Sequence, residues 1–456
     1  MRHAALPLMA THFDLSNSMQ GVVVSTLLVG AVIGSLAAGW PSDNLGRRAT
    51  IVLSGLLFIA GCVLSSYAAT SVAVLIVGRF VIGFAIGVTS ATSPMFIAEM
   101  SPVEIRGGLV MGYQLSITAG ILLALGIGHA LTPARNWELI IFLAIPFAAL
   151  QIIGMLFVPE SPRFLLRAGK RDAALSVLIR IRGSEAAALA ELAEIEEIRE
   201  AEGKVHWNTV LGPSYRGPLR AGCGLAAISA LCGINAIFYY STKIFAIAGQ
   251  GDPTLSSLAL GVTNFGASFI SLYIVNTFPR RKLLFIGNAG QIAGLVLAGA
   301  PLLTGSEVTP TAGWIMVAGI LLFICFFAFS SGPLTWVVIS EVFPLAARGK
   351  GAGIATSVNW FSNFIVALVY PMALGGTKTA REQQKRVGWS FIAFGVVCVL
   401  SIIYINAFVP ETHGKSLEEI EQDFERHRLL KASKKSGEDE PAGTPLEAPH
   451  KNVLDI

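Results

Sequence analysis

Apolar residues in this chain form long continuous runs, and charged residues are mostly confined to the segments between them. A run of about 20 apolar residues is long enough for an α-helix to cross a lipid bilayer. A membrane β-barrel would instead show segments of roughly ten residues with alternating polarity, so the pattern excludes that class. The eleven runs lie at residues 20–40, 49–69, 73–97, 106–131, 136–158, 220–248, 254–276, 282–304, 311–341, 347–374 and 386–409.

Composition supports the same class of protein. Of 456 residues, 53% are hydrophobic and 14% are charged, whereas a soluble domain carries about 25% charged residues. Lipid must therefore cover much of the surface. We expect an all-α, multi-pass integral protein of the plasma membrane or an organelle membrane. The net charge of +4, without a basic stripe, gives no indication of a nucleic-acid partner.

Lysine and arginine are concentrated in alternate loops, which the positive-inside rule assigns to the cytoplasm. One loop on the other side disagrees, because it carries Lys378, Arg381, Lys385 and Arg386. The loops assigned to the cytoplasm carry Arg47, Arg48, Arg106, the charged block 163–220, Arg280, Arg281, Arg348 and Lys350.

The charged block divides the chain. Within it, the stretch Ser184 to Lys204 has Leu189, Leu192, Ile195 and Ile198 at helical spacing, which predicts an amphipathic cytoplasmic helix. The residues after 430 are polar and predict a disordered tail. The expected divisions are a first transmembrane bundle at 1–158, a cytoplasmic helical domain at 159–219, a second bundle at 220–410 and a cytoplasmic tail at 411–456.

Three motifs occur twice in the same order, which is typical of an internal repeat. Glu99, Pro102 and Arg106 recur as Glu341, Pro344 and Arg348, the pair Arg47–Arg48 recurs as Arg280–Arg281, and Pro159–Glu160–Ser161 recurs as Pro410–Glu411–Thr412. The repeat predicts two homologous bundles. Such bundles bind a solute between them near the membrane midplane and rock to expose it to each side in turn.

The repeated charged residues fall at the expected cytoplasmic ends of spans. We expect them to form ion pairs between the bundles that hold one state closed. The alternative is that they extend to the membrane surface and only satisfy the positive-inside bias. The expected network comprises Asp43, Arg47, Arg48, Glu99, Arg106, Glu160, Arg163, Arg280, Arg281, Glu341 and Arg348.

The chain carries eight further short motifs. They are Gly39 to Arg48, Gly78–Arg79, Pro94 to Glu99, Pro159 to Arg163, Gly233 to Ser241, Gly332 to Trp336, Asn359 to Phe364 and Pro410 to Leu417. On these motifs, nearly the whole chain resembles the sugar porter family of the major facilitator superfamily. The resemblance implies two pseudo-symmetric six-helix bundles with a cytoplasmic helical domain between them. It also implies transport of hexoses, pentoses or polyols by alternating access.

The resemblance also implies sugar contacts, by matching position. Phe238 and Tyr239 would be gating aromatics. The sugar contacts would be Gln114, Asn235, Asn264, Trp336, Asn359 and Asn363. The chemistry agrees, because an amide both donates and accepts hydrogen bonds, as sugar hydroxyls do. The alternative is that these buried amides bond neighbouring helices. Trp360 either lines the site or packs.

Two departures from the family pattern affect the expected site. Ser229 and Ala230 stand where the family has two adjacent glutamines, so two sugar hydrogen bonds are lost or shortened. Each is worth about 1 kcal/mol. Asn276 stands where the family has an acid, and Pro279 stands where it has a glycine. We therefore expect the second bundle's ion-pair network to lack one member.

A third departure concerns the first helix, which the resemblance places largely before Met1. The segment Ala5 to Pro7 resembles its end. Family proton symporters carry an acid on that helix, close to the intramembrane Arg79. We therefore expect an incorrect start or a truncated gene model, with about eleven full spans in this chain. As written, the spans offer no clear titratable group, which favours facilitated diffusion over proton coupling.

Three classes of function compete. The leading one is a carrier for a monosaccharide or related polyol, with a proton as a second partner if transport is coupled. The second is a non-transporting sugar sensor or a nonfunctional product. An ATP-driven pump is excluded, because Val409 stands where the phosphate-binding motif that would end at Lys415–Ser416 needs glycine. We expect no enzyme, cofactor or metal site.

Overall fold

The helices follow the apolar runs, because a backbone in lipid must satisfy its own hydrogen bonds. The computed structural model describes residues 8–68, 71–102, 105–131, 136–202, 207–247, 253–275, 277–304, 309–344, 347–374, 379–415, 419–420, 422–424 and 426. Within those ranges it is helical, and eleven candidate membrane spans are found, which confirms the expected number. The first span begins where the Ser16 hydroxyl accepts the backbone N–H of Met19.

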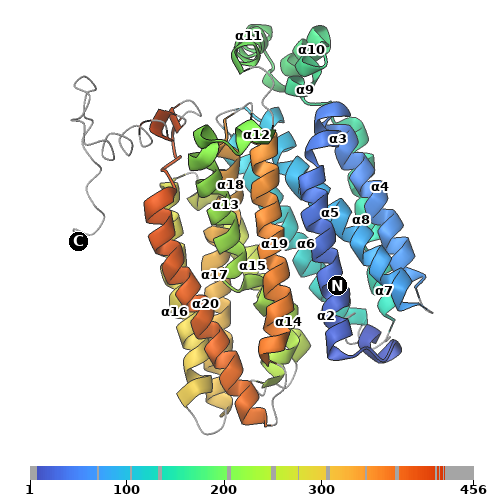
Figure 1. Cartoon of the computed structure of the whole chain (residues 1–456), viewed down its shortest axis with the longest axis vertical. Helices are drawn as coiled ribbons and strands as arrows, with labels where there is room; N and C mark the ends of the chain where they lie inside the picture. Colours follow the sequence, from blue (N-terminus) through green and yellow to red (C-terminus); the bar gives the residue numbers. More distant parts are fainter. Residues whose placement is uncertain are drawn as a thin grey trace.

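The first half of the chain forms one bundle, drawn in blue and cyan in Figure 1. Its helices are α2 (Asn17–Ala37), α3 (Gly39–Asn44), α4 (Arg47–Ser66), α5 (Val72–Met100), α6 (Arg106–Leu131), α7 (Trp137–Phe142) and α8 (Ile145–Phe157). Helices α2 and α5 pack backbone to backbone, because a Cβ on Gly83 would lie 1.9 Å from the Leu27 carbonyl oxygen. Small residues allow this close approach in a bilayer.

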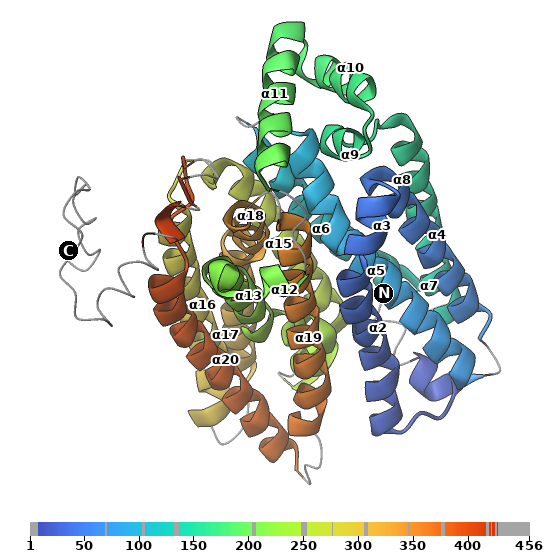
Figure 2. The ribbon, with the colours of Figure 1, turned by 45° about the horizontal axis from the view of Figure 1, so that its top comes forward.

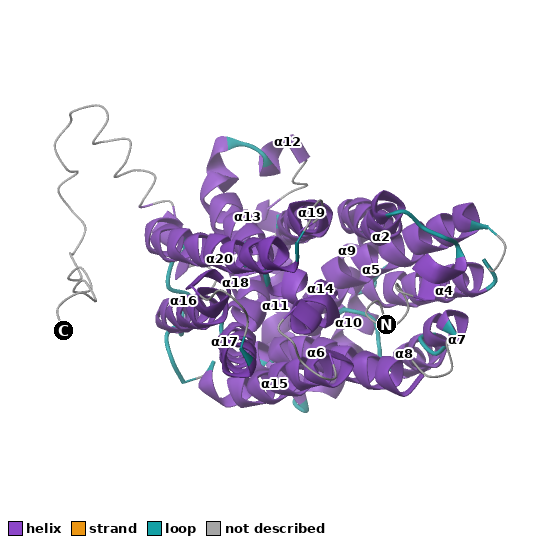
Figure 3. Cartoon of the chain, turned by 90° about the horizontal axis from the view of Figure 1, so that it is seen from below, coloured by secondary structure: helices purple, strands orange, loops and turns teal. Residues whose placement is uncertain are grey.

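The second half forms the other bundle, beside the first in Figures 1 and 3. Its helices are α13 (Arg216–Leu231), α14 (Ile234–Ile247), α15 (Pro253–Ile274), α16 (Arg280–Thr304), α17 (Pro310–Phe329), α18 (Ser331–Val342), α19 (Arg348–Leu374) and α20 (Ala380–Phe408). One span is interrupted at Gly233, where φ is +98°. Another is interrupted at Ser330, where φ is −125° and ψ is −91°. Gln291 of α16 donates to the Ser331 hydroxyl (2.9 Å) directly after that second break.

Short helices connect the halves. They are α9 (Pro162–Arg167), α10 (Arg171–Arg182), α11 (Glu185–Glu202), α12 (Trp207–Val210) and the 3-10 turn η1 (Pro213–Tyr215). Three of them, labelled α9, α10 and α11, lie beyond the end of the first bundle (Figures 1 and 2). The predicted amphipathic helix is present as α11. Its buried face holds Ala188, Leu192 and Ile195, whereas Leu189 is exposed, so that part of the predicted pattern is wrong. The predicted disordered tail lies outside the described residues.

The basic loop that breaks the positive-inside pattern has a structural use. Arg381 donates to the carbonyl oxygens of Leu302 (3.1 Å) and Leu303 (3.5 Å), at the end of α16. Arg386 donates to the Ala373 carbonyl at the end of α19 (3.4 Å). Helix C-termini leave carbonyls unpaired and carry a partial negative charge, so cations there are stabilising. These arginines cap helices, which accounts for two of the four basic residues in that loop.

Candidate functional site

Three of the predicted sugar contacts form a continuous chain of amides. Asn235 of α14 donates to the side-chain oxygen of Asn363. Asn363 in turn donates to the Asn359 side chain (3.1 Å), and Asn359 donates to the Ala226 carbonyl of α13 (2.9 Å). Asn359 and Asn363 both lie on α19 and are buried. The chain therefore ties three helices of the second half together and still leaves polar atoms at its Asn235 end.

Ser229 and Ala230, the two small residues of the expected pocket, lie next to this series of hydrogen-bonded amides. Ser229 and Ala230 are buried on α13, three and four residues after Ala226, so they share its face of the helix. That face meets α19, because Asn359 bonds the Ala226 carbonyl. The substitution of glutamines by Ser229 and Ala230 therefore removes side-chain bulk beside the amides.

The other two predicted amides lie on helices of different halves. Gln114 on α6 is 9% exposed and Asn264 on α15 is 4% exposed. Helices α6 and α15 pack against each other, because a Cβ on Gly261 of α15 would contact Leu125 of α6 at 2.9 Å. The side-chain oxygen of Asn264 has no hydrogen-bond partner among the described residues. It is therefore placed to accept a hydrogen bond from a ligand or water.

The aromatic residues fall into two groups. Tyr239 is half-buried and packs against core residues of both halves, and its neighbour Phe238 is buried in the second half. Trp360 donates from its indole nitrogen to the Ser90 hydroxyl (2.9 Å), which joins α19 to α5 of the other half. Trp360 therefore makes a packing contact between the halves.

The two halves close on the side of the ion-pair network. A second hydroxyl contact joins them there, between Ser35 of α2 and Ser357 of α19 (2.8 Å). Between the halves remains a cavity of about 20 Å³, lined among others by Trp336, Arg348 and Met95. That volume holds about one water molecule. A sugar cannot pass through this region unless the halves move apart.

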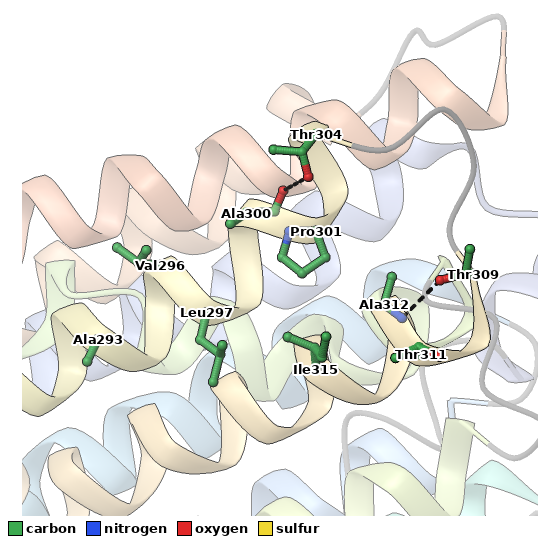
Figure 4. A pocket seen from close by; sticks show the side chains of 10 residues that line it. All are labelled: Ala293, Val296, Leu297, Ala300, Pro301, Thr304, Thr309, Thr311, Ala312 and Ile315. Atoms are coloured by element: carbon green, nitrogen blue, oxygen red, sulfur yellow. Dashed lines mark hydrogen bonds between the residues drawn. The ribbon is translucent and has the colours of Figure 1, made fainter.

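A larger cavity of about 810 Å³ lies between α16 and α17, away from the predicted sugar contacts (Figure 4). Its wall is mainly apolar and includes the exposed side chains of Val296, Leu297 and Ile315. The hydroxyls of Thr304 and Thr309 are bonded to backbone groups. This groove offers little to a sugar and suits the apolar surroundings of a membrane.

The ion-pair network of the first half is compact. Arg47 donates to both Glu99 oxygens at 3.0–3.3 Å, and the Asp43 carboxylate lies 3.5 Å from Arg47. The Ser161 hydroxyl also bonds Glu99. The Glu160 carboxylate accepts the backbone N–H groups of Arg47 and Arg48 and so caps α4.

The second half repeats this arrangement. Glu411 accepts the backbone N–H groups of Arg280 (2.9 Å) and Arg281 (3.0 Å) and so caps α16. Arg281 bonds the Asn406 carbonyl near the end of α20, as Arg48 bonds carbonyls at the end of α8. The pair of Arg280 and Glu341 is longer, at 3.8 Å. Asn276 lies outside the described residues.

The expectation of ion pairs between the bundles is wrong for the pairs Arg47–Glu99 and Arg280–Glu341. Each joins two residues of the same half. The reason is that the arginine motif at the end of one span lies beside the glutamate motif at the end of another span of the same bundle. The expected network does not include Glu411. The recurrence of Pro159–Glu160–Ser161 as Pro410–Glu411–Thr412 could have identified it.

Two further arginines of that network have other surroundings. Arg348 is the first residue of α19, and its side chain donates to the carbonyl of Phe343 (3.3 Å), the residue that follows α18. Arg163 interacts with Glu99 through its charge. The side chain of Arg106 lies outside the described residues.

The intramembrane Arg79 is buried on α5. A terminal nitrogen of its guanidinium lies 3.9 Å from the Met9 sulfur. Residues 8–12 are helical. The prediction about the first helix falls on residues 1–7, which lie outside the described residues.

Comparison with known proteins gives one consistent family. The family model "Sugar (and other) transporter" matches residues 3–424. The glucose transporter GlcP of Staphylococcus epidermidis is 36% identical over 412 residues, which cover 90% of each chain. The galactose-proton symporter of Escherichia coli is 34% identical over 430 residues, covering 94% of this chain and 90% of that one.

Solved structures agree. The proton:xylose symporter XylE bound to 6-bromo-6-deoxy-D-glucose superposes with a TM-score of 0.83 and 28% identity, covering 92% of this chain and 94% of that one. An inward-open form of XylE from E. coli gives 0.73 at the same identity and coverage. The expected major facilitator fold is thereby confirmed. The chain belongs to the sugar transporter family of the major facilitator superfamily, and is a multi-pass membrane carrier and not an enzyme.

Proposed function

We propose that the chain binds a monosaccharide or related polyol between its halves, held by Asn235 and the amide chain behind it on one side and by Gln114 and Asn264 on the other. The observation that carries the proposal is the chain of three asparagine side chains that runs from Asn235 into α19 and α13. It fixes the orientation of each amide, so Asn235 presents a defined set of donor and acceptor atoms. Preorganised polar groups of this kind give a pocket its specificity.

The chemistry matches a neutral polyhydroxyl substrate. A sugar has no charge to pair, and each hydroxyl both donates and accepts, as an amide does. Each such bond contributes about 0.5–1.5 kcal/mol, so binding requires several of them. The closer superposition on the sugar-bound XylE than on its inward-open form supports a state in which substrate enters from the side opposite the ion-pair network.

Uptake into cells without their own hexose carriers tests the proposal. A panel of labelled glucose, galactose, xylose and myo-inositol is supplied to cells that express the chain. We expect saturable uptake of at least one sugar. Asn235→Ala should raise its KM by about tenfold, because one hydrogen bond is lost and the Asn363 oxygen is left unpaired.

The matched control is Asn288→Ala. Asn288 lies in the same half and is 1% exposed, and its amide donates to the Leu284 carbonyl of its own helix (2.8 Å). This variant should leave KM unchanged. A wild-type chain present at the membrane that transports none of the panel contradicts the proposed function. Equal KM values for the two variants contradict the placement of the site.

The coupling is measured in vesicles that contain the purified chain. Two of the compared relatives are named as proton symporters, and a proton is the candidate second partner. An imposed acid gradient would then drive the sugar above its equilibrium concentration. Facilitated diffusion would give equilibration only, whatever the gradient.

A further inference from the structure

Two buried polar atoms on α15 have no hydrogen-bond partner within the part of the chain that the structure describes. They are the side-chain oxygen of Asn264 and the hydroxyl of Ser268. The two residues are 4% and 2% exposed. They are four positions apart on one helix and therefore lie on the same face, about 6 Å apart along the axis. The face carries a pair of unsatisfied groups and not an isolated one.

This face is directed at the other half. A Cβ on Gly261 would contact Leu122 and Leu125 of α6, which fixes the level at which the two helices meet. The helices run in opposite directions, and both rise about 1.5 Å per residue. Asn264 and Ser268 therefore come level with the region of α6 that holds Thr118 and Gln114. Both of these residues are buried as well.

The opposite interface between the halves differs. There the hydroxyls of Ser35 and Ser357 bond each other, and Ser90 receives the indole N–H of Trp360. Buried polar groups in native structures are paired in the large majority of cases, because an unpaired one costs free energy. Other buried hydroxyls, such as those of Ser65 and Ser401, also have no partner among the described residues. The pair on α15 differs from them by facing the level of Gln114 and Thr118 on the other half, so a substrate between the halves would supply its partner.

We propose that the hydroxyl of Ser268 is a further sugar contact, one helical turn beyond Asn264 toward the cytoplasmic end of α15. This inference rests on the proposed sugar-carrier function and extends its binding surface. A serine hydroxyl donates one hydrogen bond and accepts others, so it suits a sugar hydroxyl. Asn264 and Ser268 together would hold two different hydroxyls of one ring and so determine which isomers bind.

The test measures KM for the transported sugar and for its series of monodeoxy analogues, in wild type and in Ser268→Ala. We expect Ser268→Ala to raise KM for the parent sugar by about three- to tenfold. For one analogue, the one that lacks the hydroxyl bound by Ser268, KM should be the same in wild type and variant. Ser268→Thr keeps a hydroxyl and should restore the wild-type pattern.

The matched control is Ser271→Ala. Ser271 is fully buried on the same helix, but its hydroxyl donates to the Ser268 carbonyl (2.7 Å). This variant should keep the wild-type pattern across the analogues. The inference is overturned if Ser268→Ala changes KM equally for every analogue or for none, because the hydroxyl would then bind water or serve packing. Absence of transport by the wild-type chain would overturn the sugar-carrier function itself, and this inference with it.

Discussion

At the scale of single residues, one glycine makes the first-half network possible. Gly46 has φ of +97°, and a Cβ there would lie 2.3 Å from a Glu160 carboxylate oxygen. The missing side chain lets that carboxylate reach the N-terminus of α4. Both the backbone angle and the close approach favour glycine.

We therefore expect Gly46→Ala to destabilise the protein. A backbone with φ of +97° and ψ of 162° is essentially confined to glycine, and it costs about 1–3 kcal/mol for a residue with a Cβ. Displacement of Glu160 adds to that cost. The measurement is the melting temperature in detergent. The control is Gly112→Ala, where a Cβ meets nothing within 4 Å inside α6. A Gly46→Ala variant as stable as this control would contradict the interpretation.

At the scale of elements, the two halves use the same contacts with different tightness. Arg47 and Glu99 meet at 3.0 Å, with side chains 5% and 6% exposed. Arg280 and Glu341 are 3.8 Å apart, and the Glu341 side chain is 22% exposed. One oxygen of Glu341 has no hydrogen-bond partner among the described residues. The second-half pair is therefore looser, and its carboxylate is more exposed than that of Glu99.

This difference predicts unequal effects of matched variants. Glu99→Gln leaves the buried Arg47 charge without its main partner, and breaking a buried pair costs about 3–5 kcal/mol. Glu341→Gln should cost less, because Arg280 and Glu341 are 3.8 Å apart and the variant removes a weaker contact. Thermal unfolding of the two variants, side by side with wild type, measures the difference. A larger loss of stability for Glu341→Gln than for Glu99→Gln would contradict the conclusion that the second-half pair contributes less.

Sequence patterns predict these elements unequally well. The eleven spans follow from the length of the apolar runs, and the capping by Glu160 and Glu411 follows from a repeat that the sequence displays. Whether an ion pair lies within one half or joins the two halves cannot be predicted from the sequence. A repeat shows which residues recur, but it does not show which bundle holds their partners. The sequence does not predict the contact of Ser35 with Ser357 either. Serine is common in membrane helices, and only the packing of α2 against α19 determines which two serines meet.

At the scale of the whole molecule, neutral groups join the halves on the side that is closed. Ser35 and Ser357 touch across α2 and α19, and Trp360 reaches Ser90 of α5. Alternating access requires these contacts to separate so that the substrate can leave. The same contacts should therefore report on the conformational change.

A cross-link between α2 and α19 tests this. In the double variant Ser35→Cys and Ser357→Cys, the thiols replace hydroxyl oxygens that are 2.8 Å apart, so we expect a disulfide on oxidation. The cross-link should abolish uptake, and a reducing agent should restore it. Each single variant serves as a control for the five native cysteines. Full uptake by the cross-linked protein would contradict closure at this interface.

The confinement of the pairs Arg47–Glu99 and Arg280–Glu341 to single halves has a consequence for the rate of transport. When the halves rock, each of these pairs travels as a unit, and neither has to be pulled apart. The hydroxyl contacts that do separate exchange one neutral partner for water, at small net cost. Ionic strength, which screens exposed charges, should therefore leave the turnover number nearly constant between dilute and concentrated salt.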